Sequence, residues 1–456
     1  MKKTLMQLAT WLNIENQAFG EVEVSGISID TRTIQKGDLF IPFRGEAANG
    51  HRFVEKAFEN GAAASLWMKD EPNPPSNLPL IFVNDSEQAL QQMAAGYRAE
   101  HKATFIGITG SNGKTSSKDI LAGALSPYFK VQKTIGNFNN QLGLPITILQ
   151  LDEDTEVSVL EMGMSGFGEI EFLTKLARPH YTVITNIGEA HMRDLGSRAG
   201  IAKAKFEIVE GLQKGGKLFY DGDEPLLREL VAKRPDIQSV AFGFGEDNEL
   251  VAGDIETTEN GSEFHVVGAL NGQYSISVLG KHQVKNTLNA MLISQALGLT
   301  EEQIRVSLAQ VSLTDMRMQQ LAGVNGSLFI NDAYNAAPTS MTAAIEFMKQ
   351  TNLRSRKWLV LGDMLELGED EQSFHEQIAD VIDSATIEKV LLYGPRMKWL
   401  YDKLVLHFTE ENLVYAEDNY TPLIETVRTA DANTLLLVKG SRGTKLETII
   451  EGVCAR

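Results

Sequence analysis

One run of eight residues is suited to phosphate chemistry: Thr109, Gly110, Ser111, Asn112, Gly113, Lys114, Thr115 and Ser116. It follows an apolar run, 105–109, that predicts a buried strand, and precedes a helix expected to start near Ser116. Glycines let backbone N–H groups close around phosphate oxygens, and a helix N-terminus adds partial positive charge. Lys114 is placed to reach terminal phosphates and Thr115 to ligate Mg²⁺. The strict GxxxxGK[ST] spacing is not met, because residue 108 is Ile, yet the strand–loop–helix setting favours nucleoside triphosphate binding over a structural turn.

Three further residues come after this run. Glu161 ends the apolar run 157–160, and a carboxylate at a strand end is where Mg²⁺ is often held in such domains; a surface carboxylate is an equal alternative. His191 follows the strand-like run 181–184, and its residue type alone favours a structural role, because Mg²⁺ prefers oxygen ligands. Lys205 lies in a helix-like segment and is first interpreted as part of a solvated charged face.

A second cluster follows the strand expected at 328–331. Asp332, Tyr334 and Asn335 lie there, before Pro338 at a favoured first-turn position of a helix. Crevices at strand ends bind ligands in open α/β sheets, although Asn335 can also serve only as a helix cap. The segments 362–364 and 439–443 follow other expected strands and are further candidates.

Motifs for other enzyme classes are incomplete. The run 163–167 lacks the last glycine of a hydrolase nucleophile elbow, and 243–248 lacks the last glycine of a dinucleotide fingerprint. His375-Glu376 has no second histidine four residues on. Serine hydrolase, dehydrogenase and zinc-protease interpretations are therefore weak.

The elements that must position these residues alternate between strands and helices. The chain has 456 residues, enough for about three domains, and we expect an α/β fold with boundaries at 1–101, 102–312 and 313–456. The central domain is expected to hold a parallel sheet with an inserted antiparallel hairpin, 264–267 with 274–278. Helices are expected at 338–350, 370–384 and 443–452.

Composition narrows the functional classes. With 43% hydrophobic and 22% charged residues the chain is not disordered, and a net charge of −18 disfavours nucleic-acid binding. The one cysteine, Cys454, allows no disulfide within the chain. No apolar run approaches the ~18 residues of a membrane span, and the start is interpreted as an amphipathic helix, not a signal peptide. We expect a cytoplasmic protein without membrane insertion.

Taken in order, these segments resemble the Mur ligases, the ATP-dependent amino-acid-adding enzymes of peptidoglycan synthesis. The phosphate run resembles the family's TGTNGKT, with Ser111 in place of Thr. The resemblance covers almost the whole chain. It is also carried by the segments 29–32, 37–40, 50–53, 136–145, 161–163, 168–170 and 186–191, and by His282, Asn286 and Arg317.

The resemblance implies a fold and cofactors. It implies an N-terminal nucleotide-sugar domain, a central P-loop ATPase domain and a C-terminal Rossmann-like domain. It implies ATP with two Mg²⁺ ions, a carbamylated Lys205, and His191 as ligand or organiser of the second Mg²⁺. Carbon dioxide on a neutral lysine amine gives a long-stemmed oxygen anion suited to Mg²⁺. Lys114, Thr115 and Glu161 complete the implied catalytic and metal set.

The C-terminal domain indicates a branch of the family. Asp332 to Pro338 resembles the DxYNANP pattern of the D-Ala-D-Ala-adding branch, with Ala337 in place of Asn, and 362–368 is typical of that branch. The DNPR or DDPN motif of the third-residue-adding branch is absent. The implied reaction passes the γ-phosphate of ATP to the C-terminal carboxylate of UDP-MurNAc-tripeptide, and the amine of D-Ala-D-Ala then attacks the acyl phosphate.

The resemblance also implies binding roles. Asn286, Arg317 and Asp332 position ATP, and Tyr334 and Asn335 contact the dipeptide. Residues on the nucleotide-sugar side are Asp30, Thr31, Arg32, Arg44, His51, Asn137 and Asn140. A folylpolyglutamate synthase is the alternative ligase, disfavoured because those enzymes start near the phosphate loop; a non-catalytic P-loop switch is the alternative from another class. We expect a monomer, and the third peptide residue, lysine or diaminopimelate, stays open.

Overall fold

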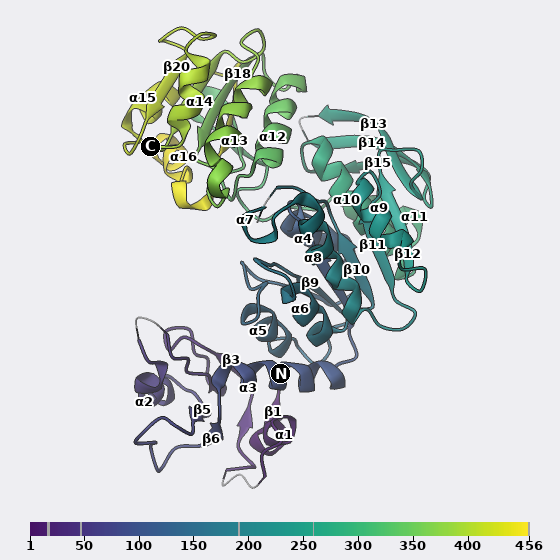
Figure 1. Cartoon of the computed structure of the whole chain (residues 1–456), viewed down its shortest axis with the longest axis vertical. Coiled ribbons are helices and arrows are strands. Elements are labelled where there is room, and N and C mark those ends of the chain that lie inside the picture. Colours follow the sequence, from purple (N-terminus) through teal and green to yellow (C-terminus); the bar gives the residue numbers. More distant parts are fainter. Residues whose placement is uncertain (16–18, 46–47, 190–191, 259, 455–456) are drawn as a thin grey trace. The chain divides into compact units, whose positions relative to one another are not determined.

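The computed structural model describes residues 1–15, 19–45, 48–189, 192–258 and 260–454. They form two compact units. Unit 1 consists of Met1–Thr109, Tyr128–Thr182 and Glu207–Lys217, and unit 2 consists of Gly110–Pro127, Val183–Phe206 and Leu218–Arg456. Strands and helices alternate along both units (Figure 1), which confirms the α/β class. The domain boundaries expected after residues 101 and 312 stay predictions.

Unit 1 begins with a four-stranded parallel sheet in the order β3-β4-β5-β6. Its strands are short apolar runs, and Phe40, Val54 and Trp67 belong to the core beside them. The helix α3 starts after Asp85, whose side chain accepts a hydrogen bond from the backbone N–H of Gln88. The elements of this region are β1 (Lys3–Thr4), α1 (Leu5–Trp11), β2 (Glu23–Val24), β3 (Gly26–Ser28), β4 (Asp38–Phe40), η1 (Gly50–Phe53), α2 (Val54–Glu59), β5 (Ala64–Met68), β6 (Leu80–Val83) and α3 (Ser86–Glu100).

Two buried parallel strands of unit 1 lead to the candidate site. β7 (Thr104–Thr109) pairs with β9 (Val157–Glu161), and Ile108 is the register partner of Glu161. All five residues of β9 are buried, as expected for a strand of a covered parallel sheet. Thr109 and Glu161 therefore end at one edge of the sheet. The neighbouring elements are β8 (Val131–Lys133), α5 (Gly143–Leu149), α6 (Glu169–Ala177), β10 (Tyr181–Ile184) and η2 (Glu207–Gly211).

The central sheet has nine strands in the order β15-β14-β13-β12-β11-β10-β7-β9-β8. The strands β13, β14 and β15 are antiparallel, and Phe264 on β14 pairs with Tyr274 on β15. This confirms the hairpin expected from the sequence and adds β13 to it. The elements of this part of unit 2 are α4 (Lys114–Leu125), α7 (Met192–Leu195), α8 (Arg198–Phe206), β11 (Lys217–Asp221), α9 (Pro225–Ala232), β12 (Gln238–Gly243), β13 (Leu250–Thr258), β14 (Gly261–Gly268), β15 (Gly272–Ile276), α10 (Lys281–Ala296) and α11 (Glu301–Leu308).

The last part of unit 2 is a six-stranded sheet in the order β16-β17-β21-β18-β19-β20, in which only the β16–β17 pair is antiparallel. Successive residues of β18 point into two different cores: Leu359 into one and Trp358 and Val360 into the other. The sheet is thus buried on both faces. Its elements are β16 (Gln319–Ala322), η3 (Val324–Gly326), β17 (Leu328–Asn331), α12 (Pro338–Gln350), β18 (Arg356–Gly362), η4 (Gly368–Asp370), α13 (Glu371–Gln377), η5 (Ile378–Val381), β19 (Lys389–Tyr393), α14 (Met397–Leu404), β20 (Leu413–Ala416), α15 (Thr421–Val427), β21 (Thr434–Lys439), η6 (Arg442–Thr444) and α16 (Glu447–Cys454).

Two of the expected helix ranges need correction. The single helix expected at 370–384 is the series η4, α13 and η5, because the chain tightens into 3₁₀ turns on both sides of α13. The helix expected at 443–452 starts later, at Glu447, after Lys445 takes a left-handed backbone conformation (φ 45°). The helix expected at 338–350 is confirmed by α12.

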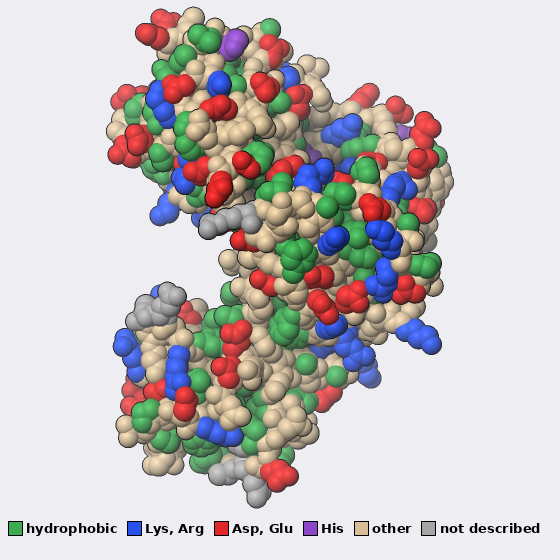
Figure 2. All heavy atoms as spheres, in the orientation of Figure 1, with side chains coloured by type: hydrophobic (Ala, Val, Ile, Leu, Met, Phe, Trp, Pro, Cys, Tyr) green, Lys and Arg blue, Asp and Glu red, His purple; other side chains and the backbone are tan. Residues whose placement is uncertain are grey.

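The surface is of mixed charge. On the face shown in Figure 2, acidic and basic side chains are interspersed over the described residues. Among the helices that the structure describes, none is both long and apolar enough to span a membrane.

Candidate active site

The phosphate loop begins directly after β7 and is held by the residues that follow β10. The backbone N–H of Ser111 donates to the carbonyl of Asn186 (3.1 Å), and that of Asn112 donates to Oδ1 of Asn186 (2.8 Å). Oγ1 of Thr185 donates to the carbonyl of Asn112 (2.5 Å), and a Cβ at Gly110 would lie only 1.8 Å from this hydroxyl. Gly110 therefore has to be glycine. The loop is a rigid element fixed by two strand-end side chains.

The loop also carries its cation and a helix N-terminus. Gly113 takes a left-handed conformation (φ 79°) and is the N-cap of α4, whose first residue is Lys114. Nζ of Lys114 donates to the carbonyl of Gly110 (2.8 Å), so the ammonium group lies over the loop. Ser116 follows on α4 and is buried. Backbone N–H groups, helix dipole and ammonium group together make an anion-binding site.

Three buried polar atoms at this site have no hydrogen-bond partner among the described residues. They are Oγ of Ser111, Nδ2 of Asn112 and Nε of Arg317. Buried polar groups are normally paired, and each of these three atoms can donate a hydrogen bond. Three unsatisfied donors beside a helix N-terminus suit a bound polyphosphate.

Arg317 connects the loop to the C-terminal part of unit 2. Its Nη2 donates to Oγ1 of Thr115 (3.0 Å), the hydroxyl expected to ligate Mg²⁺. Its guanidinium carbon lies 4.2 Å from the centre of the Tyr334 ring. The structure thus brings together three residues to which different roles were assigned: metal ligation, ATP positioning and dipeptide contact.

The start of α10 packs against the same loop. Oδ1 of Asn286 would lie 2.5 Å from a Cβ at Gly113, so its side chain abuts the loop. Nδ2 of Asn286 donates to Oε1 of Gln283 (3.0 Å), which orients the amide. Burial lowers the pKa of His282 to about 4, with a smaller opposing effect from Asp332, so this imidazole is neutral at pH 7.

Lys205 is buried, contrary to the solvated position that its residue type suggested. It lies on α8 and is 2% exposed. Burial lowers its pKa well below the ordinary value, and the positive charge of Lys114 lowers it further. Both effects favour the neutral, nucleophilic form of the amine. His191, which was assigned a role at the second metal, lies outside the described residues.

The cluster after β17 is joined to the end of β21. Oδ2 of Asp332 pairs with Nζ of Lys439 (2.6 Å), and Lys439 also donates to the carbonyl of Asn335 (3.1 Å). The structural alternative for Asn335 was wrong, because Ala337 is the N-cap of α12 and Oδ1 of Asn335 accepts from its neighbour Ala336 (2.9 Å). The side chain of Asn335 is exposed.

In unit 1, Glu161 is the last residue of β9. Its Oε1 accepts a hydrogen bond from Nδ2 of Asn139 (2.9 Å), and its register partner is Ile108, two residues before Gly110. Oγ1 of Thr109 donates to the carbonyl of Met162 (2.9 Å). Among the described side chains, no group of three or more His, Cys, Asp or Glu residues could hold a metal. Mg²⁺ sites built from one carboxylate, one hydroxyl and substrate oxygens do not need such a group.

The residues assigned to the nucleotide sugar lie in unit 1. Arg32 forms two hydrogen bonds with the Asp30 carboxylate through Nε and Nη2 and thereby lowers the pKa of Asp30 to about 2. The carbonyl of Thr31 accepts from Asn60. Oδ1 of Asn140 accepts from the backbone N–H of Gly143 (2.9 Å), the first residue of α5, whereas Asn137 is exposed.

Arg44 and His51 are held by partners that the sequence did not indicate. The guanidinium of Arg44 binds Asp70 and Glu71, both at 2.8 Å. The His51 ring is buried: its Nδ1 lies 2.9 Å from Oδ1 of Asn49, and its Nε2 accepts from the backbone N–H of Met68. These contacts give both residues structural roles, and their assignment to substrate stays a prediction.

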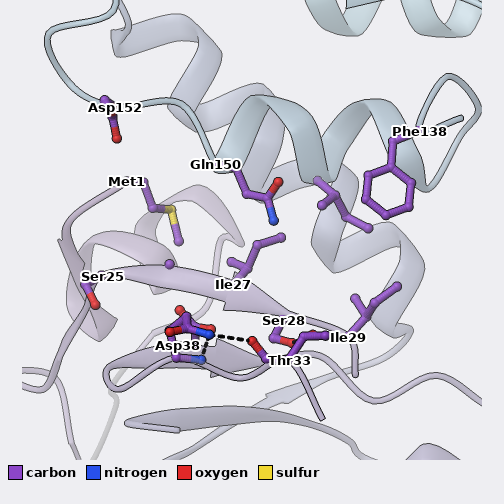
Figure 3. Close-up of a pocket in the computed structure, with 13 residues that line it drawn as sticks. Met1, Ser25, Ile27, Ser28, Ile29, Thr33, Asp38, Phe138, Gln150 and Asp152 are labelled. Carbon is purple, nitrogen blue, oxygen red and sulfur yellow. Dashed lines mark hydrogen bonds between the residues drawn. The ribbon is translucent and has the colours of Figure 1, made fainter. Parts of the chain in front are cut away.

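A cavity of about 330 Å³ opens beside the Asp30–Arg32 segment. Figure 3 shows Ile27 and Ile29 projecting from the strand side of this cavity, with Phe138 and Gln150 on its opposite side. Ser28, Thr33, Gln35 and Asp38 add hydroxyl, amide and carboxylate groups, and the lining includes no lysine or arginine. An apolar cavity of this size with a few polar groups suits an uncharged ring.

Sequence reasoning missed the residues that orient the site. Thr185 and Asn186 hold the phosphate loop, Gln283 orients the amide of Asn286, and Asn139 donates a hydrogen bond to Glu161. None of these four residues was assigned a role from the sequence. A signal existed for two of them, because Thr185 and Asn186 directly follow the predicted strand 181–184 and so had to lie at the same sheet edge as the loop.

Comparisons with known proteins agree along the chain. Residues 23–98 match the description "Mur ligase family, catalytic domain", residues 108–294 match "Mur ligase middle domain", and residues 316–442 match "Mur ligase, glutamate ligase domain". The UDP-N-acetylmuramoyl-tripeptide–D-alanyl-D-alanine ligase of Bacillus subtilis (strain 168) is 42% identical over 453 residues, which cover 99% of this chain and 98% of that protein.

Solved structures show the same likeness. A crystal structure of MurF from Acinetobacter baumannii superposes with a TM-score of 0.88 at 27% identity and covers 100% of this chain and 99% of that one. MurF ligase from Thermotoga maritima, in complex with ADP, has a TM-score of 0.83 at 26% identity and covers 94% and 97%.

Proposed function

Because the chain belongs to the Mur ligase family, we propose that it joins D-Ala-D-Ala to UDP-MurNAc-tripeptide with ATP as phosphoryl donor. The observation that carries this proposal is the phosphate loop: the unsatisfied donors of Ser111 and Asn112, together with Nε of Arg317, fit a polyphosphate, and Arg317 links the loop to Tyr334, which is assigned to the second substrate. The full-length similarity to a UDP-N-acetylmuramoyl-tripeptide–D-alanyl-D-alanine ligase supports these substrates.

The reaction has two steps. In the first, a carboxylate oxygen of the tripeptide attacks the γ-phosphorus of ATP, the bond to the bridging oxygen breaks, and ADP leaves. In the second, the dipeptide amine attacks the acyl carbon, the carbon–oxygen bond to phosphate breaks, and the amine nitrogen loses a proton. The product is UDP-MurNAc-pentapeptide, with ADP and phosphate.

The first step brings an anion to a polyanion, so cationic groups and donors must stabilise the transferring phosphoryl group. Lys114 lies over the loop and binds the terminal phosphates. The side-chain donors of Ser111, Asn112 and Arg317 bind phosphate oxygens. Asn286, whose amide is oriented by Gln283, positions the nucleotide.

Mg²⁺ is part of the proposal, and the residues present fit it. Thr115 offers a hydroxyl oxygen, Glu161 a buried carboxylate, and Lys205 a neutral amine that can take up CO₂; His191 is assigned with them. When bound, Mg²⁺ supplies charge neutralisation at the phosphates. Thr115, Glu161 and a carbamylated Lys205 would each offer it an oxygen ligand.

Carbamylation of Lys205 is supported by its burial. Only a neutral amine adds to CO₂, and burial lowers the pKa of this amine and so favours its neutral form. The product is a carbamate anion in a site with the Lys114 cation nearby. A charged ammonium in the same place would repel both Lys114 and a metal.

The cavity beside Asp30–Arg32 is the proposed site of the uridine end of the sugar nucleotide. Ile29 and Phe138 offer apolar faces to a planar base, and Ser28, Thr33 and Asp38 offer hydrogen-bonding groups. Arg32, at the exposed rim, is the nearby cation for the diphosphate. Nucleotide-linked precursors and ATP are cytoplasmic metabolites, so we place the enzyme in the cytoplasm. We also expect the enzyme to be a monomer.

The test is phosphate release with Mg²⁺, ATP, UDP-MurNAc-tripeptide and D-Ala-D-Ala, omitting each in turn and offering both the lysine and the diaminopimelate tripeptide. We expect release that needs every component, with the mass of UDP-MurNAc-pentapeptide appearing. Absence of release with either tripeptide, from folded protein that binds ATP, would reject the proposal and lead to assays with folate and glutamate.

A further inference from the structure

The segment that carries Arg317 has an unusual backbone. Its two neighbours, Met316 (φ 62°) and Met318 (φ 51°), both take the left-handed conformation. This conformation costs a non-glycine residue roughly 1–2 kcal/mol, and two such residues around one arginine are rare. A strained backbone persists only where surrounding contacts hold it. The hydrogen bonds that hold this strained segment indicate which residues it positions.

Those contacts come from two directions. Towards the phosphate loop, Thr314 donates through its N–H (3.0 Å) and its Oγ1 (2.6 Å) to Oδ2 of Asp119, one turn after Thr115 on α4. Towards the segment that follows β17, residues 332–337, the N–H of Met318 donates to Oδ1 of Asp332 (3.1 Å). The carbonyl of Met316 accepts from the N–H of Tyr334 (3.3 Å).

Arg317 itself spans the same two regions. One nitrogen, Nη2, reaches Thr115, and the flat guanidinium lies 4.2 Å from the Tyr334 ring centre. A cation over an aromatic face within about 6 Å is attracted to it. Its Nε is buried and has no partner among the described residues. The guanidinium of Arg317 is therefore already positioned beside Thr115, although its Nε has no hydrogen-bond partner among the described residues.

We propose that Tyr334 is a positioning residue for Arg317: its ring holds the guanidinium towards the phosphate loop, so that the segment after β17 sets the affinity of the loop for MgATP. This inference rests on the proposed function for the role of Arg317, and it assigns Tyr334 a second role beyond contact with the dipeptide. The pre-aimed guanidinium lowers the entropy cost of binding the nucleotide.

The experiment measures binding of MgATP alone to the full chain by calorimetry. Tyr334→Phe keeps the ring and should bind within twofold of the parent. Tyr334→Leu removes the ring and should bind about fivefold more weakly, within the usual range for a partly desolvated cation–π contact. In an Arg317→Met background, Tyr334→Leu should add no further loss, because the residue through which Tyr334 acts is gone.

Three results would overturn the inference. One is that Tyr334→Leu weakens MgATP binding equally in both backgrounds, which would show a general structural effect. The second is unchanged MgATP binding with a raised KM for D-Ala-D-Ala only. The third is equal loss in Tyr334→Phe and Tyr334→Leu, which would assign the effect to the hydroxyl. If Tyr334→Leu does not fold, Tyr334→Met is measured in its place.

Failure of the proposed function can be distinguished from failure of the positioning role of Tyr334. A parent protein that binds MgATP but makes no pentapeptide would contradict the ligase assignment and leave the binding measurements interpretable. A parent that makes pentapeptide, with binding unaffected by Tyr334→Leu, would contradict only the positioning role.

Discussion

Nζ of Lys439 lies 2.6 Å from Oδ2 of Asp332; Lys439 is the last residue of β21, and Asp332 directly follows β17, the parallel neighbour of that strand. Both side chains are largely buried. Lys439→Met leaves a buried carboxylate without its partner, and breaking such a pair costs about 3 kcal/mol or more. We expect the Tm of the full chain to fall by roughly 10 °C and ligase activity to be lost with it.

The matched control is Lys398→Met. Lys398 pairs with Asp402 on the exposed face of α14, and both side chains are about half exposed. Loss of an exposed pair costs about 0.5 kcal/mol or less. Differential scanning calorimetry of both variants separates the cases, and equal Tm values for Lys439→Met and Lys398→Met would show that the buried pair does not stabilise the segment after β17.

Lys205→Ala should reduce turnover by about 100-fold, a loss typical when a group that holds a metal is removed. Added bicarbonate should not restore it, because no amine remains. The direct measurement is a ¹³C NMR spectrum after incubation with ¹³C-bicarbonate. We expect one carbamate resonance in the parent and none in Lys205→Ala.

Lys203→Ala is the control on the same helix, because Lys203 is exposed two residues away. It should retain both the resonance and turnover. Full activity in Lys205→Ala would contradict the carbamate assignment outright.

Glu161→Gln keeps the shape of the side chain and the hydrogen bond from Asn139 but removes the charge. We expect the Mg²⁺ concentration for half-maximal activity to rise about tenfold, because a neutral amide is a weaker ligand for Mg²⁺ than a carboxylate. Circular dichroism should stay unchanged. Glu153→Gln, at an exposed position before β9, serves as the control. Unaltered Mg²⁺ dependence together with loss of folded protein would assign Glu161 a structural role.

These predictions depend on features that the sequence revealed unequally. The strand–loop–helix around Lys114 could be predicted because glycines, a buried strand and a helix start are all local signals. The burial of Lys205 could not, because helical periodicity describes one covered face and says nothing of a second covering element. The pairs of Arg44 with Asp70 and of His51 with Met68 also escaped prediction, since they join segments brought together only by the fold.

The stability of the C-terminal part should depend on the protonation of Asp363. Burial raises the pKa of Asp363 to about 6, above the value of about 3.9 in an unfolded chain. Between pH 4 and pH 6 the folded state therefore binds more protons, and stability falls as the pH rises through this window. Above pH 6 the cost is fully present, at roughly 2–3 kcal/mol.

Asp363→Asn removes this cost while its Oδ1 can still accept from the backbone N–H of Met397. The variant should have a higher Tm than the parent at pH 7.5 and an equal Tm at pH 4.5. Asp402→Asn, at an exposed site, should show no such pH-dependent difference. A lower Tm for Asp363→Asn at pH 7.5 would mean that attraction to Arg396, 3.7 Å away, outweighs burial.

The left-handed backbone at Met316 can be tested without touching Arg317. Met316→Gly removes the conformational penalty at φ 62° and should leave the Tm unchanged or raised by a few degrees, since the side chain is only half-buried. Met316→Val places a β-branched residue in the same conformation and should lower stability by about 2 kcal/mol. Met316→Leu, unbranched at Cβ, is the control and should resemble the parent. If Met316→Val is as stable as Met316→Leu, the backbone at residue 316 is not held in the left-handed region. The ring of Tyr334 alone then positions the guanidinium of Arg317.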